Sequence, residues 1–225
     1  AVNTTGANNT AVGALSLDAN TTADSNTGLG YAALTANTTG AGGTAVGTNA
    51  LLSLTTGNEN TAVGFNALDA ATTGAVNTAV GAYALSAVTT AANNTGIGYG
   101  ALAANTGAGN TAVGSNAGAA ITTGVQNTFV GNLAGDAMTT SNNNTAIGFQ
   151  ALTSGTTGYE NYAGGVAALN DTTTGYRNVA IGHIAGYAIN AGNNNTCVGY
   201  AAGSVTTTGA NNLLLGKDAG LSGSP

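Results

Sequence analysis

Residues 60–76 read NTAVGFNALDAATTGAV, and variants of this stretch recur from one end of the chain to the other. Its glycine belongs to a series with constant spacing, broken once where the step from Gly98 to Gly114 is one residue shorter. The series comprises Gly13, Gly30, Gly47, Gly64, Gly81, Gly98, Gly114, Gly131, Gly148, Gly165, Gly182, Gly199 and Gly216. A short fixed period predicts stacked coils rather than a fold built around one centre.

The chain divides into 13 repeats, and we call the residues at the same place in successive repeats a column. The repeats start at residues 9, 26, 43, 60, 77, 94, 110, 127, 144, 161, 178, 195 and 212. We therefore expect residues 1–225 to form a single elongated repeat domain. This domain is either a segment of a longer chain or the subunit of a filament.

The columns favour strands and turns over helices. Column one is Asn in 12 of 13 repeats, column four is apolar in 12, and column five is always Gly. Apolar residues do not follow the 3.6-residue spacing of a helix, and the density of Gly and Thr disfavours helix. We predict an all-β fold, a β-solenoid or β-roll of about 13 coils with a 17-residue period.

The residue type in each column predicts its structural role. Alternation along Thr61-Ala62-Val63 places Thr and Val on one face and Ala on the other, and we expect the Val column to be buried as an apolar ladder. The glycine that follows suits a corner with positive φ. Column-one Asn side chains should form an amide ladder between coils. The Thr-Thr-Gly segment should form a second short strand, and Cys197 should fill an Ala column.

Two irregularities interrupt the pattern. The coil at residues 94–109 lacks one Thr of the usual pair, and Gly164 stands where column four otherwise has an apolar side chain. We expect Gly164 to remove a core side chain, and we expect the stack to bend, bulge or present a surface at both places.

The composition argues against several classes of function. Arg177 and Lys217 are the only basic residues among 4% charged residues, with a net charge of −6, so we expect no nucleic-acid partner. No apolar run reaches the roughly 18 residues of a membrane helix, so we do not expect a membrane-embedded protein. The one cysteine, the one histidine (His183) and the scattered carboxylates predict no catalytic, metal or cofactor site. We expect a protein that is not an enzyme.

Aromatic and basic side chains are the candidates for surface contact, because Tyr and Arg are enriched at binding surfaces. Three of the aromatic residues recur in column six of alternate repeats. An equally weighted alternative is that this column packs between the chains of an oligomer. The candidates are Tyr31, Phe65, Tyr99, Phe149, Tyr159, Tyr162, Tyr176, Arg177, His183, Tyr187 and Tyr200.

The motif NVAIG at Asn178–Gly182 resembles the SVAIG-type repeat in the heads of trimeric autotransporter adhesins. The longer pattern, NTAVG followed by Ala-Leu and TTG, looks like repeats of phage tail fibres and bacterial surface fibre proteins. The resemblance implies a left-handed parallel β-roll and a homotrimer. The period is longer here than in the adhesin heads.

These observations lead to a non-enzymatic extracellular fibre or adhesin, at the cell surface or on a virion, with reach and multivalent attachment as its mechanism. Its partners would be copies of itself and a cell-surface or carbohydrate receptor. One alternative is a filament subunit that polymerises end to end. Another is an ice-binding solenoid that uses the hydroxyl array of the Thr-Thr columns.

Overall fold

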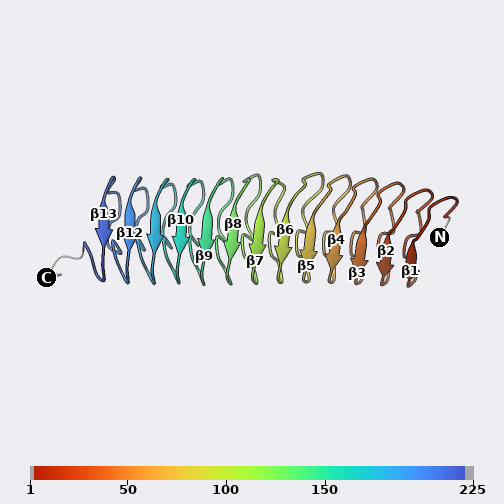
Figure 1. Ribbon diagram of the computed structural model, residues 1–225, viewed down its shortest axis with the longest axis horizontal. Coiled ribbons are helices and arrows are strands. Elements are labelled where there is room, and N and C mark those ends of the chain that lie inside the picture. Colours follow the sequence, from red (N-terminus) through yellow and green to blue (C-terminus); the bar gives the residue numbers. More distant parts are fainter. Residues whose placement is uncertain (1–2, 221–225) are drawn as a thin grey trace. The chain divides into compact units, whose positions relative to one another are not determined.

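The computed structural model describes residues 3–220 and is all-β, as predicted (Figure 1). Every strand has three residues, and no helix occurs among the described residues. The strands are β1 (Thr10–Val12), β2 (Thr27–Leu29), β3 (Thr44–Val46), β4 (Thr61–Val63), β5 (Thr78–Val80), β6 (Thr95–Ile97), β7 (Thr111–Val113), β8 (Thr128–Val130), β9 (Thr145–Ile147), β10 (Tyr162–Gly164), β11 (Val179–Ile181), β12 (Thr196–Val198) and β13 (Leu213–Leu215).

The chain forms two compact units, Ala1–Asn110 and Thr111–Pro225. Unit 1 contains β1 to β6, and unit 2 contains β7 to β13. Within each unit, strands that follow one another in sequence pair in parallel, and each residue pairs with its equivalent in the next coil, as Thr61 does with Thr78. Each unit is therefore a parallel β-solenoid with one short strand per coil.

The recurring glycine marks a corner after the strand, as predicted. At Gly81 φ is +130°, and a Cβ atom would lie 2.5 Å from the carbonyl oxygen of Gly98 in the next coil. Both the backbone conformation and the close approach of the next coil exclude larger residues here. The invariance of this column follows from the stacking itself.

Each coil also contains non-glycine residues with positive φ, which is uncommon for such residues. In one coil they are Asn66, Leu68 and Val76, with φ of 51°, 53° and 57°. The amides of Asn66 and Val76 donate to carbonyls of the preceding coil at 3.1 and 3.0 Å, and the amide of Leu68 donates to the following coil at 3.0 Å. Hydrogen bonds between coils thus offset the cost of this conformation.

The predicted asparagine ladder is present. The Oδ1 atom of Asn60 accepts from both the backbone amide and the side-chain Nδ2 of Asn77, at 3.0 and 3.1 Å. The Nδ2 atom of Asn60 donates to the carbonyl of Gly74 at 2.8 Å. The buried side-chain amide of Asn60 is thus satisfied by its own coil and by a neighbouring coil, as burial of a polar group requires.

The prediction that the Val column is buried is wrong. Ala62 is fully buried, whereas Val63 is only half-buried and Ile147 is 42% exposed. In unit 1 the interior is filled by the leucines of column nine, such as Leu85, which leave space for only a small side chain at column three. At Gly96 of that column, a Cβ atom would already lie 3.0 Å from Cγ of Leu85.

The Thr-Thr-Gly segment is a bend rather than the predicted second strand. Its residues still link the coils: both the amide and the hydroxyl of Thr55 donate to the carbonyl of Thr72, at 2.9 and 3.0 Å. One carbonyl therefore accepts two bonds from one residue, a pattern different from a strand ladder.

Cys197 is fully buried in the Ala column, as predicted, but Gly164 does not remove a core side chain. Gly164 lies on the outward side of β10, and a Cβ atom there would lie 3.1 Å from the ring of Tyr162. The missing Thr of the shorter coil falls between buried Asn105 and Gly107, whose carbonyl accepts from Nδ2 of Asn105 at 2.9 Å. A bend at this coil stays a prediction.

Candidate functional surface

In unit 1, column six lies directly after the corner glycine and alternates strictly between small and aromatic residues. Tyr31, Phe65 and Tyr99 are 54%, 45% and 57% exposed. The residues between them in the column are Ala14, Thr48 and Ala82. Large rings therefore project from every second coil.

Tyr83, which the sequence analysis did not single out, completes this row. Its ring centroid lies 5.4 Å from that of Phe65 and 6.0 Å from that of Tyr99, with interplanar angles of 82° and 83°. Tyr83 is in column seven, next to Ala82, so it fills the gap that the small residue leaves. The sequence signal that could have pointed to Tyr83 is its place next to Ala82, the small residue that separates two aromatic residues in column six. We call Tyr31, Phe65, Tyr83 and Tyr99 the aromatic row of unit 1.

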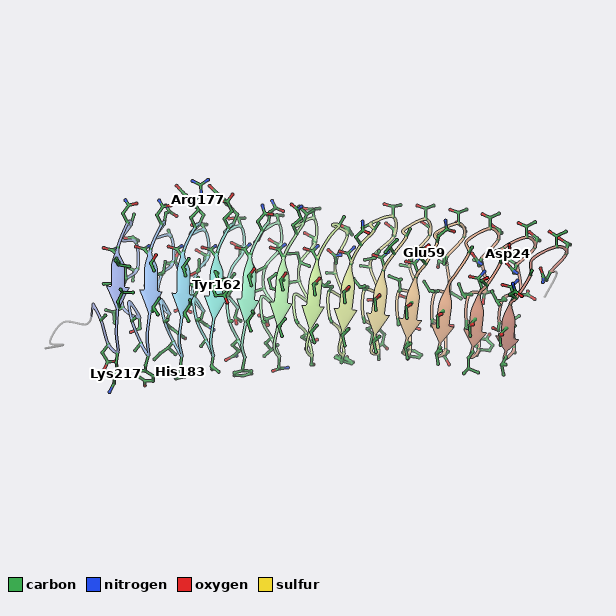
Figure 2. The ribbon with its side chains drawn as sticks, in the orientation of Figure 1. Asp24, Glu59, Tyr162, Arg177, His183 and Lys217 are labelled. Carbon is green, nitrogen blue, oxygen red and sulfur yellow. The ribbon has the colours of Figure 1, made fainter. Side chains whose placement is uncertain are left out.

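In unit 2 the same column loses the alternation. It contains Phe149, His183, Tyr200 and Lys217. The rings of His183 and Tyr200 are 5.4 Å apart and tilted by 35°, and Nζ of Lys217 lies 5.9 Å from the Tyr200 ring centroid. His183 and Lys217 both lie at the lower edge of the coils in Figure 2.

A second cluster lies at the opposite edge of unit 2, where Figure 2 places Arg177. The rings of Tyr159 and Tyr176 stack at 4.8 Å with an interplanar angle of 3°. Nε of Arg177 donates to Oε2 of Glu160 at 2.7 Å, and its guanidinium lies 5.7 Å from the Tyr176 ring centroid. The hydrogen bond to Glu160, followed by the charge of Glu160, raises the pKa of Arg177.

The remaining two candidates occupy different columns from the members of both clusters. Tyr162 is in column two of β10, on the outward side of the sheet, where it is 39% exposed. Tyr187 is in column ten and is half-buried. The predicted site residues thus belong to different surfaces, and the structure does not gather them into one site.

The outward side of the strands forms a further uncharged surface, made by columns two and four, which we call the outer sheet face. In unit 1 each strand presents one Thr and one Val, Leu or Ile to the outside. The hydroxyls of Thr44, Thr61 and Thr78 have no hydrogen-bond partner among the described residues, and Leu29 and Ile97 are 46% and 38% exposed. Apolar side chains that are exposed or half-buried thus follow one another coil after coil.

Two carboxylates in column ten have an unusual environment. Oδ1 of Asp69 in unit 1 and Oδ1 of Asp136 in unit 2 are buried without a hydrogen-bond partner. Burial raises the pKa of both groups, against the lowering effect of nearby backbone amides. Burial likewise raises the pKa of the Cys197 thiol.

The described part of the chain contains no pocket and no group of three His, Cys, Asp or Glu residues that could hold a metal ion. None of its elements is a helix of the length and apolar character that crossing a membrane requires. The chemistry that the geometry offers is that of exposed rings, threonine hydroxyls and amides, repeated in every coil or in every second coil along each unit.

Comparisons with known protein families, with curated proteins and with solved structures find no match to this chain.

Proposed function

We propose that the chain is a non-enzymatic structural fibre segment that acts outside the cell, at a cell surface or on a virion, as an adhesin or tail-fibre shaft. Copies of the chain associate side by side, with a homotrimer favoured by the resemblance of the repeat, which also implies left-handed coils. Attachment arises from many weak contacts repeated along the coils.

The observation that carries the proposal is the outer sheet face. Soluble monomeric proteins rarely expose contiguous apolar surface beyond a few hundred Å². Here columns two and four of unit 1 contain no charged residue in any of the six strands, and Val12 is 55% exposed. Such a face is most stable against another apolar surface, and a second copy of the chain offers one with the same spacing between coils.

The test is the mass in solution together with an image of the particles. We expect a mass that is a multiple of the chain mass of 21.2 kDa, and elongated particles. Joined particles of unlimited length would favour the end-to-end filament instead. A compact globular particle of a single chain would contradict the proposal.

An ice-binding solenoid is the second candidate, and the structure favours a different face for it from the one that the Thr-Thr columns suggested. The hydroxyls of Thr38 and Thr55 are engaged as donors to the next coil, at 3.1 and 3.0 Å. The hydroxyls of Thr44, Thr61 and Thr78 on the outer sheet face, by contrast, have no partner among the described residues. They repeat at the strand spacing of about 4.8 Å beside a parallel column of apolar side chains.

A thermal-hysteresis measurement separates the two candidates. Ice binding predicts a freezing point below the melting point for the wild-type chain and loss of this gap in Thr61→Lys. The control is Thr55→Lys, at the bend. Absence of thermal hysteresis in the wild type would exclude this candidate and leave the fibre proposal standing.

A further inference from the structure

We propose that the aromatic row of unit 1 binds an extended, neutral polysaccharide of β-linked sugars, lying along the direction in which the coils stack. This inference deepens the proposed attachment function by naming a ligand class, and it rests on that function. Three properties of the row carry it: the spacing of the rings, their orientation and the neutrality of their surroundings.

The spacing of the rings is the first step. Coils joined by parallel strands lie about 4.8 Å apart, so rings on every second coil repeat at about 10 Å. Tyr31, Phe65 and Tyr99 occupy three successive positions of this repeat. In an extended β-1,4-linked chain the structure repeats after every second sugar, at a closely similar length. Every aromatic residue of the column would thus meet an equivalent sugar.

The orientation of the rings is the second step. Tyr83 contacts both Phe65 and Tyr99 edge to face, at 5.4 and 6.0 Å, so the three side chains support one another. Such pairs add about 0.5–1.5 kcal/mol to the burial of the rings. Side chains that are already ordered lose less conformational entropy on binding a ligand.

The chemistry around the rings is the third step. The electron-rich face of an aromatic ring attracts the weakly positive C–H groups on the flat side of a sugar ring. Beside Phe65, Asn49 donates from Nδ2 to Oδ1 of Asn66 at 3.1 Å, while Nδ2 of Asn66 has no partner among the described residues. That amide and the tyrosine hydroxyls can bond sugar hydroxyls. Columns four to seven of unit 1 contain no charged residue, so the row favours a neutral polymer over an acidic or basic one.

The experiment measures retention of the full chain on insoluble cellulose and chitin, with insoluble α-linked amylose as the geometric control. We expect retention on a β-linked polymer and none on amylose. The triple variant Tyr31→Ala, Phe65→Ala, Tyr99→Ala should lower the affinity at least about tenfold. The control variant Val76→Ala, Val166→Ala, Val205→Ala removes the same number of exposed apolar side chains outside the aromatic row, and should bind like the wild type.

Circular dichroism of each variant shows whether it folds, and its mass in solution shows whether its association has changed. If the triple variant does not fold, Phe65→Ala alone tests the row, with at least a threefold loss expected. Failure of the wild type to bind either β-linked polymer would overturn the inference, as would equal losses in the two triple variants. A change in solution mass of the unit 1 variant would also overturn it, because the row would then pack between copies. The fibre proposal itself is tested by the mass and the image of the wild-type chain, which do not depend on any of these results.

Discussion

At the scale of single residues, the corner glycine is the most constrained position. We predict that Gly81→Ala lowers the free energy of unfolding by about 3 kcal/mol or more, because the new Cβ must displace the carbonyl of Gly98 and adopt a strained φ of +130°. Urea unfolding followed by circular dichroism measures the change.

The matched control for this prediction is Gly216→Ala. Gly216 has the same kind of conformation, with φ of +108°, but no atom lies within 4 Å of the place where its Cβ would be. The loss at Gly216 should therefore be about 1–2 kcal/mol, from strain alone. Equal losses at the two glycines would show that close stacking of the coils is not the cause of the invariance of the column.

The buried carboxylates of column ten provide a second prediction at this scale. At the same position in other coils, Thr35 donates to the carbonyl of Leu15 at 3.0 Å and Asn170 donates to that of Gln150 at 3.0 Å. An ionised Asp69 cannot donate in this way, and its Oδ1 has no partner. We predict that Asp69→Asn stabilises the fold by about 1 kcal/mol near neutral pH, because the amide supplies the missing donor.

The pH dependence follows from the direction of the pKa shift. Because burial raises the folded-state pKa of Asp69 and of Asp136 above the ordinary value of 3.8, the unfolded chain ionises first as the pH rises. Their contribution to stability is greatest below about pH 3.8 and is lost as the pH rises through the folded-state pKa. The urea concentration at the midpoint of unfolding should thus differ less between about pH 4 and pH 7 in the double variant Asp69→Asn, Asp136→Asn than in the wild type.

Asp24→Asn is the control for this pair. Oδ1 of Asp24 accepts from the backbone amide of Ala7 at 2.6 Å, just as Oδ1 of Asn58 accepts from Ala41 in the same column. The substitution keeps an acceptor in place and should change stability by less than about 0.5 kcal/mol. A stabilisation as large as that of Asp69→Asn would mean that relief of net negative charge, rather than the buried acceptor, is responsible.

At the scale of elements, the two faces of each strand could be predicted from the sequence, but which of them is buried could not. The alternation of Thr, Ala and Val predicted two faces correctly, and the periodic Asn and Gly predicted the amide ladder and the corner. Which face is inside depends on volume, because the leucines of column nine already fill the coil. Val63 has the larger apolar side chain, so hydrophobicity alone pointed to the wrong face.

This reversal gives a prediction for β4. Ala62→Val should destabilise the fold by about 1–3 kcal/mol, because it overpacks a fully buried position. Val63→Ala, on the outward side, should cost less than about 1 kcal/mol in the free energy of unfolding of the isolated chain. Chemical unfolding of the two variants, at a concentration where both have the same mass in solution, compares them. A larger loss for Val63→Ala would contradict the observed orientation of the strand.

Columns three and nine compensate each other in volume at one coil of unit 2. There Phe129 stands in place of the inward alanine of most coils, and column nine, which is leucine throughout unit 1, is Gly135; a Cβ atom at Gly135 would collide with the Phe129 ring. We predict that Phe129→Ala costs about 3–5 kcal/mol because it leaves a cavity. Adding Gly135→Leu should recover part of that loss, whereas Gly135→Leu alone should destabilise the fold.

A double-mutant cycle measures this coupling by chemical unfolding of the four proteins. A leucine is compatible with the backbone conformation at position 135, because Leu51 and Leu68 occupy column nine with φ of 52° and 53°, near the 61° of Gly135. Additive effects of the two substitutions would contradict direct packing between the columns.

At the scale of the whole molecule, the repeat predicted the all-β class, the period and the stacking of coils, because each of these depends only on columns. The surfaces depend on neighbours between columns, which a column-by-column reading does not contain. Tyr83 was missed for this reason, since it contacts column six from column seven. The ion pair of Arg177 and Glu160 could have been predicted from the columns alone. The two residues share a column, and equivalent positions in adjacent coils lie side by side.

The last prediction concerns association through the outer sheet face. Val46→Lys combined with Val80→Lys places two charges on the outward side of unit 1, where both valines are half-buried in the single chain. If copies pack through this face, the charges lose their water on association, and the mass in solution should fall toward the single-chain value of 21.2 kDa. Sedimentation of the variant and the wild type at equal concentration measures the difference.

The control is Val76→Lys, because Val76 is 50% exposed but lies in column seventeen rather than on the outer sheet face. It adds a lysine without placing one on columns two or four, so the mass should stay at the wild-type value. A double variant that keeps the wild-type mass and unfolds like the wild type would show that copies meet through another surface. Because the lysines point outward, loss of association without loss of circular dichroism would identify the outer sheet face as the contact between chains.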